Sequence, residues 1–85
     1  MKPVVVYRTA WCPFCQRAEA LLAARGVSDP QIIDVDEEPE RRREMIERSG
    51  RTTVPQIFIG DVHVGGCDDL HALDRRGELA SLLQS

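Results

Sequence analysis

A Cys-x-x-Cys segment stands near the start of the sequence, between two contrasting patterns. Before it, Val4 to Tyr7 form a nearly continuous β-branched run, which is typical of a strand buried on both faces. After it, apolar residues recur near helical spacing as far as Gly26, and Pro13 suits the first turn of a helix. We therefore expect Cys12 and Cys15 at the N-terminal end of a helix that follows a buried strand, which is an α/β arrangement.

The rest of the sequence alternates between strand and helix patterns. Gln31 to Val35 are separated from the first strand by a helical crossover, which predicts a parallel pair. Gly60-Asp61 separates two short strand patterns and signals an antiparallel hairpin. The order β-α-β-α-β-β-α with a short C-terminal helix predicts a four-stranded mixed sheet flanked by helices. The expected bounds are strands at 4–7, 31–35, 56–59 and 62–64, and helices at 13–26, 40–49 and 67–73, with a last helical piece that ends at Leu82 and Leu83.

Size and composition limit the classes of function. With 85 residues the chain has room for one compact domain, residues 1–85, and 42% hydrophobic with 29% charged residues is the balance of an ordinary folded domain. A net charge of -3 and an aromatic content of 5% supply neither the basic surface nor the stacking side chains of nucleic-acid binding. The apolar stretch before Arg8 is too short for a signal peptide or a membrane span. We therefore expect a cytoplasmic protein that binds neither nucleic acid nor membrane.

The spacing of the cysteines indicates redox chemistry. Cys12 and Cys15 stand one helical turn apart, close enough for a reversible disulfide. Cys12 is expected to be a thiolate nucleophile, because unpaired N–H groups and the helix dipole favour an anion there, whereas Cys15 lies deeper and suits the resolving role. A zinc site would need a second pair of Cys or His, and Cys67, His63 and His71 do not provide one. We therefore predict no metal ligand.

Three segments of the sequence resemble the glutaredoxin family, and within it the dithiol type known in bacteria as glutaredoxin 3. They are Cys12-Pro13-Phe14-Cys15, the segment Arg-Ser-Gly-Arg-Thr-Thr-Val-Pro-Gln-Ile-Phe-Ile at 48–59, and Gly-Gly-Cys-Asp-Asp-Leu at 65–70. The resemblance implies a thioredoxin fold and the reduction of protein disulfides and of glutathione mixed disulfides. It implies glutathione as co-substrate, no tightly bound cofactor, and disulfide-containing or glutathionylated proteins as partners of a monomer. Two residues depart from the family pattern, since Phe14 replaces its usual tyrosine and Arg8 its usual lysine.

The same resemblance implies where glutathione binds. A cis peptide before Pro55 would leave the N–H and C=O of Val54 free to hold an extended peptide, although a proline at the first residue of a strand is also common. The start of the helix after Gly66 would accept the γ-glutamyl carboxylate, whereas the acidic residues there also suit helix capping. Arg8 would face the glycine carboxylate, or remain a solvated residue at the end of a strand. The predicted glutathione-binding residues are Arg8, Phe14, Thr53, Val54, Pro55, Gly66, Cys67 and Asp68.

Three other functions remain open on the sequence. In an iron-sulfur carrier, Cys12 of two chains and two glutathiones would hold the cluster, but the relatives with that role usually carry a small residue where this chain has Pro13. A thioredoxin-like donor reduced by a flavin enzyme would not need the glutathione-site segments. A zinc or scaffold protein would be distinguished by metal analysis.

Two side chains, Trp11 and Cys67, have roles that the sequence leaves undecided. Trp11 either shapes the surface that meets a protein substrate or covers the edge of the core. Cys67 is either a small residue at a helix start or an oxidisable thiol, and the former is favoured. His63, between Val62 and Val64, is expected to point to solvent.

Overall fold

The computed structural model describes residues 1–85, which form one four-stranded sheet and four helices. The elements in chain order are β1 (Val4–Arg8), α1 (Pro13–Ala24), β2 (Gln31–Asp34), α2 (Pro39–Ser49), β3 (Gln56–Ile59), β4 (Val62–Gly65), α3 (Cys67–Arg75) and α4 (Leu79–Gln84). The strand order is β2-β1-β3-β4, with β1 parallel to β2 and the other two pairs antiparallel. This is the thioredoxin fold, so the predicted fold class and element order are confirmed. None of the helices combines the length and the hydropathy that a membrane crossing requires.

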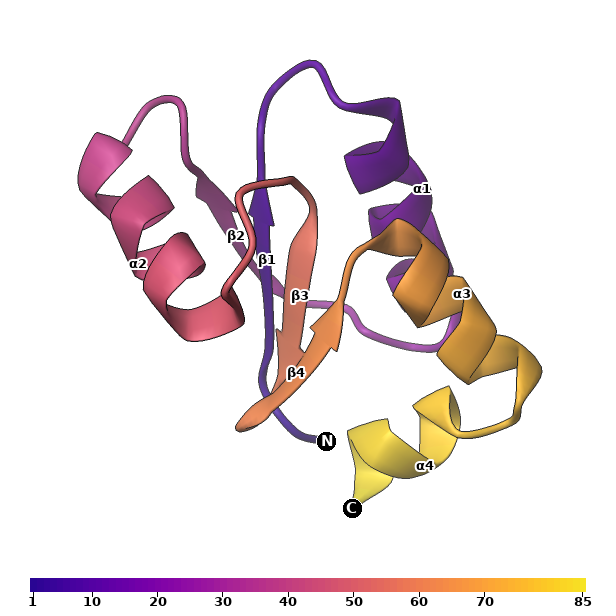
Figure 1. Ribbon diagram of the computed structural model, residues 1–85. Coiled ribbons are helices and arrows are strands. Elements are labelled where there is room, and N and C mark those ends of the chain that lie inside the picture. Colours follow the sequence, from indigo (N-terminus) through magenta and orange to yellow (C-terminus); the bar gives the residue numbers. More distant parts are fainter.

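Helices cover both faces of the sheet, with α1, α3 and α4 on one side and α2 on the other (Figure 1). Val4 and Val6 of β1 belong to the larger core cluster, whereas Tyr7 belongs to the cluster under α2. Successive side chains of a strand point to opposite faces, so a central strand with two covered faces needs an uninterrupted apolar run. The run that starts the sequence is therefore explained by the position of β1 between β2 and β3.

The larger cluster fixes α1 and α3 against the sheet. Ala18 and Leu22 of α1 and Leu70 of α3 are fully buried. The cluster consists of Val4, Val6, Ala18, Leu22, Val27, Ile57, Ile59, Cys67, Leu70, Leu79 and Leu83. These contacts fix the positions of α1 and α3 on the sheet. As a result, the N-terminal ends of both helices lie at the same end of the molecule (Figure 1).

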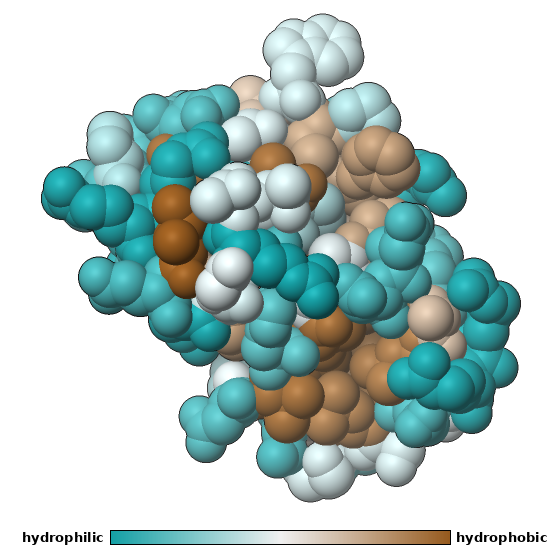
Figure 2. Space-filling view, in the orientation of Figure 1, coloured by the Kyte–Doolittle hydropathy of each residue, from teal (hydrophilic) through white to brown (hydrophobic).

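Helix α2 is held mainly by Met45, which is its only buried residue. The helix begins at Pro39 and is followed by Gly50, whose φ of 72° lies in the left-handed region that glycine adopts without strain. Its other side chains are largely charged and form ion pairs such as Arg41 with Glu44. Hydrophilic residues accordingly predominate on this side of the molecule in Figure 2, around a small apolar area, and apolar residues gather over β4, α3 and α4.

Candidate active site

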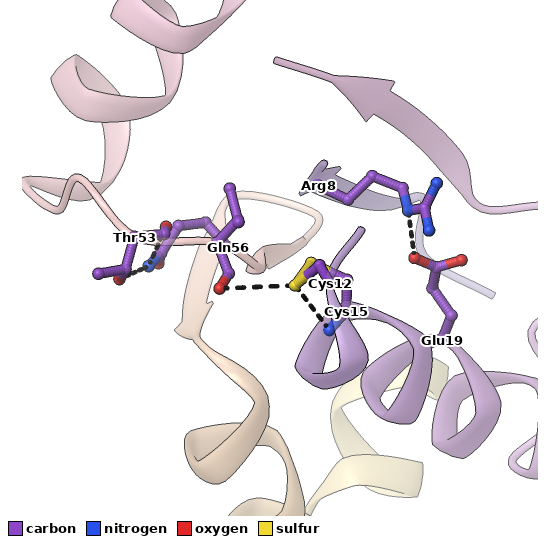
Figure 3. The surroundings of a disulfide bond; sticks show 7 residues. Arg8, Cys12, Cys15, Glu19, Thr53 and Gln56 are labelled. Carbon is purple, nitrogen blue, oxygen red and sulfur yellow. Dashed lines mark hydrogen bonds and ion pairs between the residues drawn. A yellow bond between two sulfur atoms is a disulfide. The ribbon is translucent and has the colours of Figure 1, made fainter. Parts of the chain in front are cut away.

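The two N-terminal cysteines form a disulfide at the start of α1, with their Cα atoms 5.1 Å apart. Cys12 is the N-cap of the helix, and Pro13 occupies the first turn, where a missing N–H leaves no helical bond unmade. The Sγ atom of Cys12 accepts a hydrogen bond from the backbone N–H of Cys15 at 3.1 Å (Figure 3). Once the disulfide is reduced, this donor and the helix dipole favour a thiolate at Cys12.

The two sulfur-bearing residues differ in exposure. Cys12 is 7% exposed and Cys15 is 0% exposed. An attacking thiolate must meet a disulfide from outside the molecule, whereas a resolving thiol needs to reach only its neighbour. Cys12 is therefore the more accessible of the two thiols, and Cys15 lies deeper, as the sequence predicts.

The loop between α2 and β3 lies beside Cys12. Its Val54-Pro55 peptide bond is cis, as predicted. The carbonyl oxygen of Val54 lies 4.0 Å from Sγ of Cys12. In the disulfide form the sulfur carries no proton, so this distance describes a contact and not a hydrogen bond. The loop thus presents backbone groups to any molecule that reaches Cys12.

A cleft of about 230 Å³ opens next to the disulfide. One wall is the loop that contains Val54, and the other is the beginning of α3. The two walls lie close together at Gly66, where a Cβ atom would lie 3.4 Å from the carbonyl oxygen of Pro55. The first N–H groups of α3 have no acceptor within their own helix, so they are available to an anion in the cleft. The lining residues are Phe14, Arg51, Thr53, Val54, Pro55, Gly66, Cys67, Asp68 and Asp69.

Of the predicted glutathione-binding residues, only Arg8 does not line this cleft. Its Nε atom lies 2.8 Å from Oε2 of Glu19 on α1 (Figure 3). The two atoms meet off the axis of a linear hydrogen bond, so the contact is an ion pair. Seven of the eight predicted residues therefore line one cleft, whereas Arg8 lies outside it and is paired with Glu19.

Two lining residues, Arg51 and Asp69, were not predicted as site residues. A guanidinium nitrogen of Arg51 donates to Oδ2 of Asp69 at 2.8 Å, and the backbone N–H of Gly66 donates to the same oxygen at 2.8 Å. The hydrogen bond from Arg51 is the largest cause that holds the pKa of Asp69 below its ordinary value. The sequence signals the capping role of Asp69 in the first turn of α3, but no local pattern signals its partner Arg51.

Cys67 is a buried free thiol, 4% exposed. Its Sγ atom lies 3.5 Å from Nδ1 of His71, which also lies 2.9 Å from the carbonyl oxygen of Cys67. Burial raises the pKa of the Cys67 thiol. These observations favour the interpretation of Cys67 as a small residue at a helix start.

Trp11 and Phe14 flank the disulfide on the outer surface. Trp11 is 90% exposed and Phe14 is 53% exposed, with the guanidinium of Arg17 5.7 Å from the centre of the Phe14 ring. The alternative in which Trp11 covers the core edge is therefore wrong. The exposed rings of Trp11 and Phe14 thus form an aromatic surface next to Cys12.

The prediction that His63 points to solvent is wrong. In the hairpin His63 pairs with Phe58, whose ring is buried under α2, and the register shifts between Ile57 and Phe58. The His63 ring stacks on Phe58 with ring centres 4.9 Å apart and contacts the side chain of Gln56. Simple alternation within one strand did not reveal this register, which depends on the partner strand.

A thioredoxin fold with a disulfide-forming Cys-x-x-Cys at the N-terminus of its first helix, beside a cis-proline, defines a thiol-disulfide oxidoreductase. No three His, Cys, Asp or Glu side chains lie together as a metal ion would need.

Comparisons with known proteins identify the family. The glutaredoxin family model matches residues 4–64. A glutaredoxin of Pseudomonas aeruginosa is 59% identical over 85 residues, covering 100% of both chains. Glutaredoxin 3 of Escherichia coli K12 is 56% identical over 84 residues, covering 99% of this chain and 100% of its own. The crystal structure of a buckwheat glutaredoxin-glutathione complex is 32% identical, with a TM-score of 0.87 over 98% of this chain and 77% of its own.

The chain belongs to the glutaredoxin family, and its cysteine pair fits the dithiol class. Glutaredoxins are glutathione-dependent thiol-disulfide oxidoreductases, and this is the activity of the chain. The resemblance predicted from the sequence is confirmed.

Proposed function

We propose that Cys12 is the nucleophile and Cys15 the resolving thiol of this activity. The observation that carries the assignment is the position of Cys12 at the N-cap of α1, where its Sγ accepts the N–H of Cys15 and lies 4.0 Å from the carbonyl oxygen of Val54, which lines the cleft. Cys15 is completely buried and therefore meets no external disulfide directly.

In the monothiol route, the Cys12 thiolate attacks the glutathionyl sulfur of a mixed disulfide. The sulfur-sulfur bond breaks, the substrate leaves as a thiolate that takes up a proton, and Cys12 is left joined to glutathione. A second glutathione thiolate attacks the glutathionyl sulfur, which releases oxidised glutathione and regenerates the Cys12 thiolate.

In the dithiol route, the Cys12 thiolate attacks a protein disulfide and forms a mixed disulfide with one of its sulfurs. The thiolate of Cys15 then attacks Sγ of Cys12, so the substrate leaves fully reduced and the Cys12-Cys15 disulfide forms. Two glutathione molecules then reduce that disulfide. The exposed side chain of Trp11 beside Cys12 suits contact with a protein substrate.

Glutathione binds in the cleft as an extended peptide. Its cysteinyl part pairs with the N–H and C=O of Val54, and its γ-glutamyl carboxylate meets the first N–H groups of α3 at Cys67 and Asp68. The support is the shape and the donors of the cleft, together with the buckwheat glutaredoxin-glutathione complex of the same fold. For Arg8 to reach the glycine carboxylate, it must exchange its ion pair with Glu19 for the ligand.

The wider role follows from this chemistry. We propose that residues 1–85 act as one monomeric domain in the cytoplasm, on disulfide-containing or glutathionylated proteins. A monomer is supported by the cleft, whose walls and thiol pair all come from one chain. The reduced cytoplasm supplies the glutathione that each turnover consumes.

The assignment is tested by trapping the intermediate. Cys15→Ser is incubated with oxidised glutathione and its peptides are mapped by mass spectrometry. We expect glutathione on Cys12, where the adduct persists because Cys15 cannot displace it and no reduced glutathione is added to release it. Glutathione found on Cys67 instead would contradict the assignment.

A further inference from the structure

Gln56 is a completely buried polar residue directly after the cis-proline. Its side-chain Nε2 donates to the carbonyl oxygen of Thr53 at 3.1 Å and lies 3.3 Å from Oγ1 of the same residue (Figure 3). Its Oε1 lies 2.7 Å from Nε2 of His63. A buried amide has to satisfy both ends, and here one end ties β3 to the loop that lines the cleft.

The orientation of this amide follows from its partners. A carbonyl oxygen only accepts hydrogen bonds, so the Gln56 nitrogen must face Thr53 and the Gln56 oxygen must face His63. The oxygen needs a donor, and therefore Nε2 of His63 carries a proton. The three groups form a chain of hydrogen bonds that runs from His63 through Gln56 to the backbone of Thr53.

The far end of the chain is fixed by packing under α2. The His63 ring stacks on Phe58, and the guanidinium of Arg48 lies 4.0 Å from the centre of the same Phe58 ring. Arg48 also donates to the hydroxyl of Tyr7 at 2.8 Å. His63 is therefore held directly by the hairpin register and by its stacking on Phe58, and it holds Gln56 in turn.

We propose that Gln56 and His63 are positioning residues for glutathione. By fixing the Thr53 carbonyl, they orient the Thr53-Val54 peptide, whose N–H belongs to Val54 and faces the ligand. The Val54 carbonyl stands 4.0 Å from Sγ of Cys12, so a tilt of this segment changes how a bound glutathionyl sulfur meets the thiolate. The inference rests on the proposed binding of glutathione at Val54, and it adds two residues that do not line the cleft.

The test compares three variants in the coupled assay of glutathione, glutathione reductase and a small glutathione mixed disulfide. Gln56→Met keeps the length of the side chain but removes its donor and acceptor. His63→Phe keeps a ring that can stack on Phe58 but removes the donor. Tyr7→Phe is the matched control, because it keeps the buried ring and removes only the hydroxyl, whose partners are Glu44 and Arg48 and not the Thr53-Gln56-His63 chain.

We expect Gln56→Met to raise the KM for the mixed disulfide by about tenfold, because it removes the hydrogen bonds to both Thr53 and His63. We expect His63→Phe to raise it by about threefold, because it removes only the hydrogen bond to Gln56. The rate at which iodoacetamide alkylates Cys12 in the reduced protein should stay the same, because the N–H of Cys15 is not affected. Tyr7→Phe should leave KM unchanged. If Gln56→Met does not fold, His63→Phe carries the test.

Two results would overturn the inference. One is a KM within about twofold of the wild-type value in the folded Gln56→Met or, failing that, in His63→Phe. The other is an equal rise of KM in Tyr7→Phe, which would mean that general loosening of the cluster is responsible. Failure of the proposed function is distinguishable, since it would appear in the wild type as an absence of glutathione-dependent turnover.

Discussion

Arg51 and Asp69 form an ion pair across the cleft, with a guanidinium nitrogen of Arg51 2.8 Å from Oδ2 of Asp69. The loop before β3 and the first turn of α3 are thereby connected by side chains as well as by packing. Asp69 also caps α3 through the N–H of Gly66. A single carboxylate therefore contacts both walls of the cleft in which we propose that glutathione binds.

Asp69→Asn should destabilise the protein at neutral pH by about 1 kcal/mol, the cost of losing a partly exposed ion pair together with a negative charge at a helix N-terminus. Arg51 holds the pKa of Asp69 below its ordinary value of 3.8, so the folded carboxylate contributes stability above that pH. The contribution is lost as pH falls through the folded pKa. Denaturant unfolding at pH 7 and near pH 2 measures the difference, which should shrink in acid. A constant difference at both pH values would contradict this account.

His63→Phe should change how stability depends on pH. Burial, with a smaller effect of Arg51, lowers the pKa of His63, and the carboxylate of Asp69 opposes this shift. Arg48 also faces the ring and lowers its pKa. The unfolded chain then binds a proton near pH 6.5 that the folded chain resists, so wild-type stability falls as pH drops below that value.

Thermal unfolding at pH 7.5 and pH 5 of the two proteins measures this effect. The wild type should lose more stability than His63→Phe on acidification. An equal loss in both proteins would mean that the ring does not titrate differently on unfolding.

Cys67 should be unreactive in the folded, reduced protein. Burial raises the pKa of its thiol, and only 4% of the residue is exposed, so little thiolate is available to an alkylating agent at neutral pH. Limited iodoacetamide treatment followed by peptide mass spectrometry should find Cys12 modified first and Cys67 modified only in denaturant. Comparable labelling of both cysteines under native conditions would show that Cys67 is an accessible redox thiol.

Met45→Ala should cost roughly 2–5 kcal/mol, the range for truncating a fully buried large side chain. Met45 is the one residue that α2 buries completely, so no neighbour in the helix compensates for it. Ile46→Ala provides a control, because Ile46 is only partly buried against the same cluster. Chemical denaturation of both variants measures the costs, and an equal or larger loss in Ile46→Ala would contradict the assigned packing.

Local chemistry made much of the fold predictable. Pro13 marks the beginning of α1, Gly50 ends α2 with a positive φ, and the Gly60-Asp61 hairpin connects β3 to β4. Each of these signals acts within a few residues of its own position. The apolar run at the start of β1 was equally informative, because its two buried faces are a property of the strand itself.

Contacts between distant elements were not predictable. The ion pair of Arg8 with Glu19 depends on how α1 packs beside β1. The ion pair of Arg51 with Asp69 depends on where α3 begins relative to the loop before β3. The packing of His63 against Phe58 and Gln56 depends on the register of β4 against β3. Such contacts follow from tertiary geometry, and single-residue patterns carry no information about them.

The most direct test of the division of labour between the thiols is the initial rate of glutathione mixed disulfide reduction in wild type, Cys12→Ser and Cys15→Ser. NADPH consumption coupled through glutathione reductase reports the turnover. We predict that Cys12→Ser abolishes activity, whereas Cys15→Ser retains it, because the monothiol route needs only the thiolate at the N-cap of α1. Loss of activity in Cys15→Ser, or activity that persists in Cys12→Ser, would contradict the assigned roles.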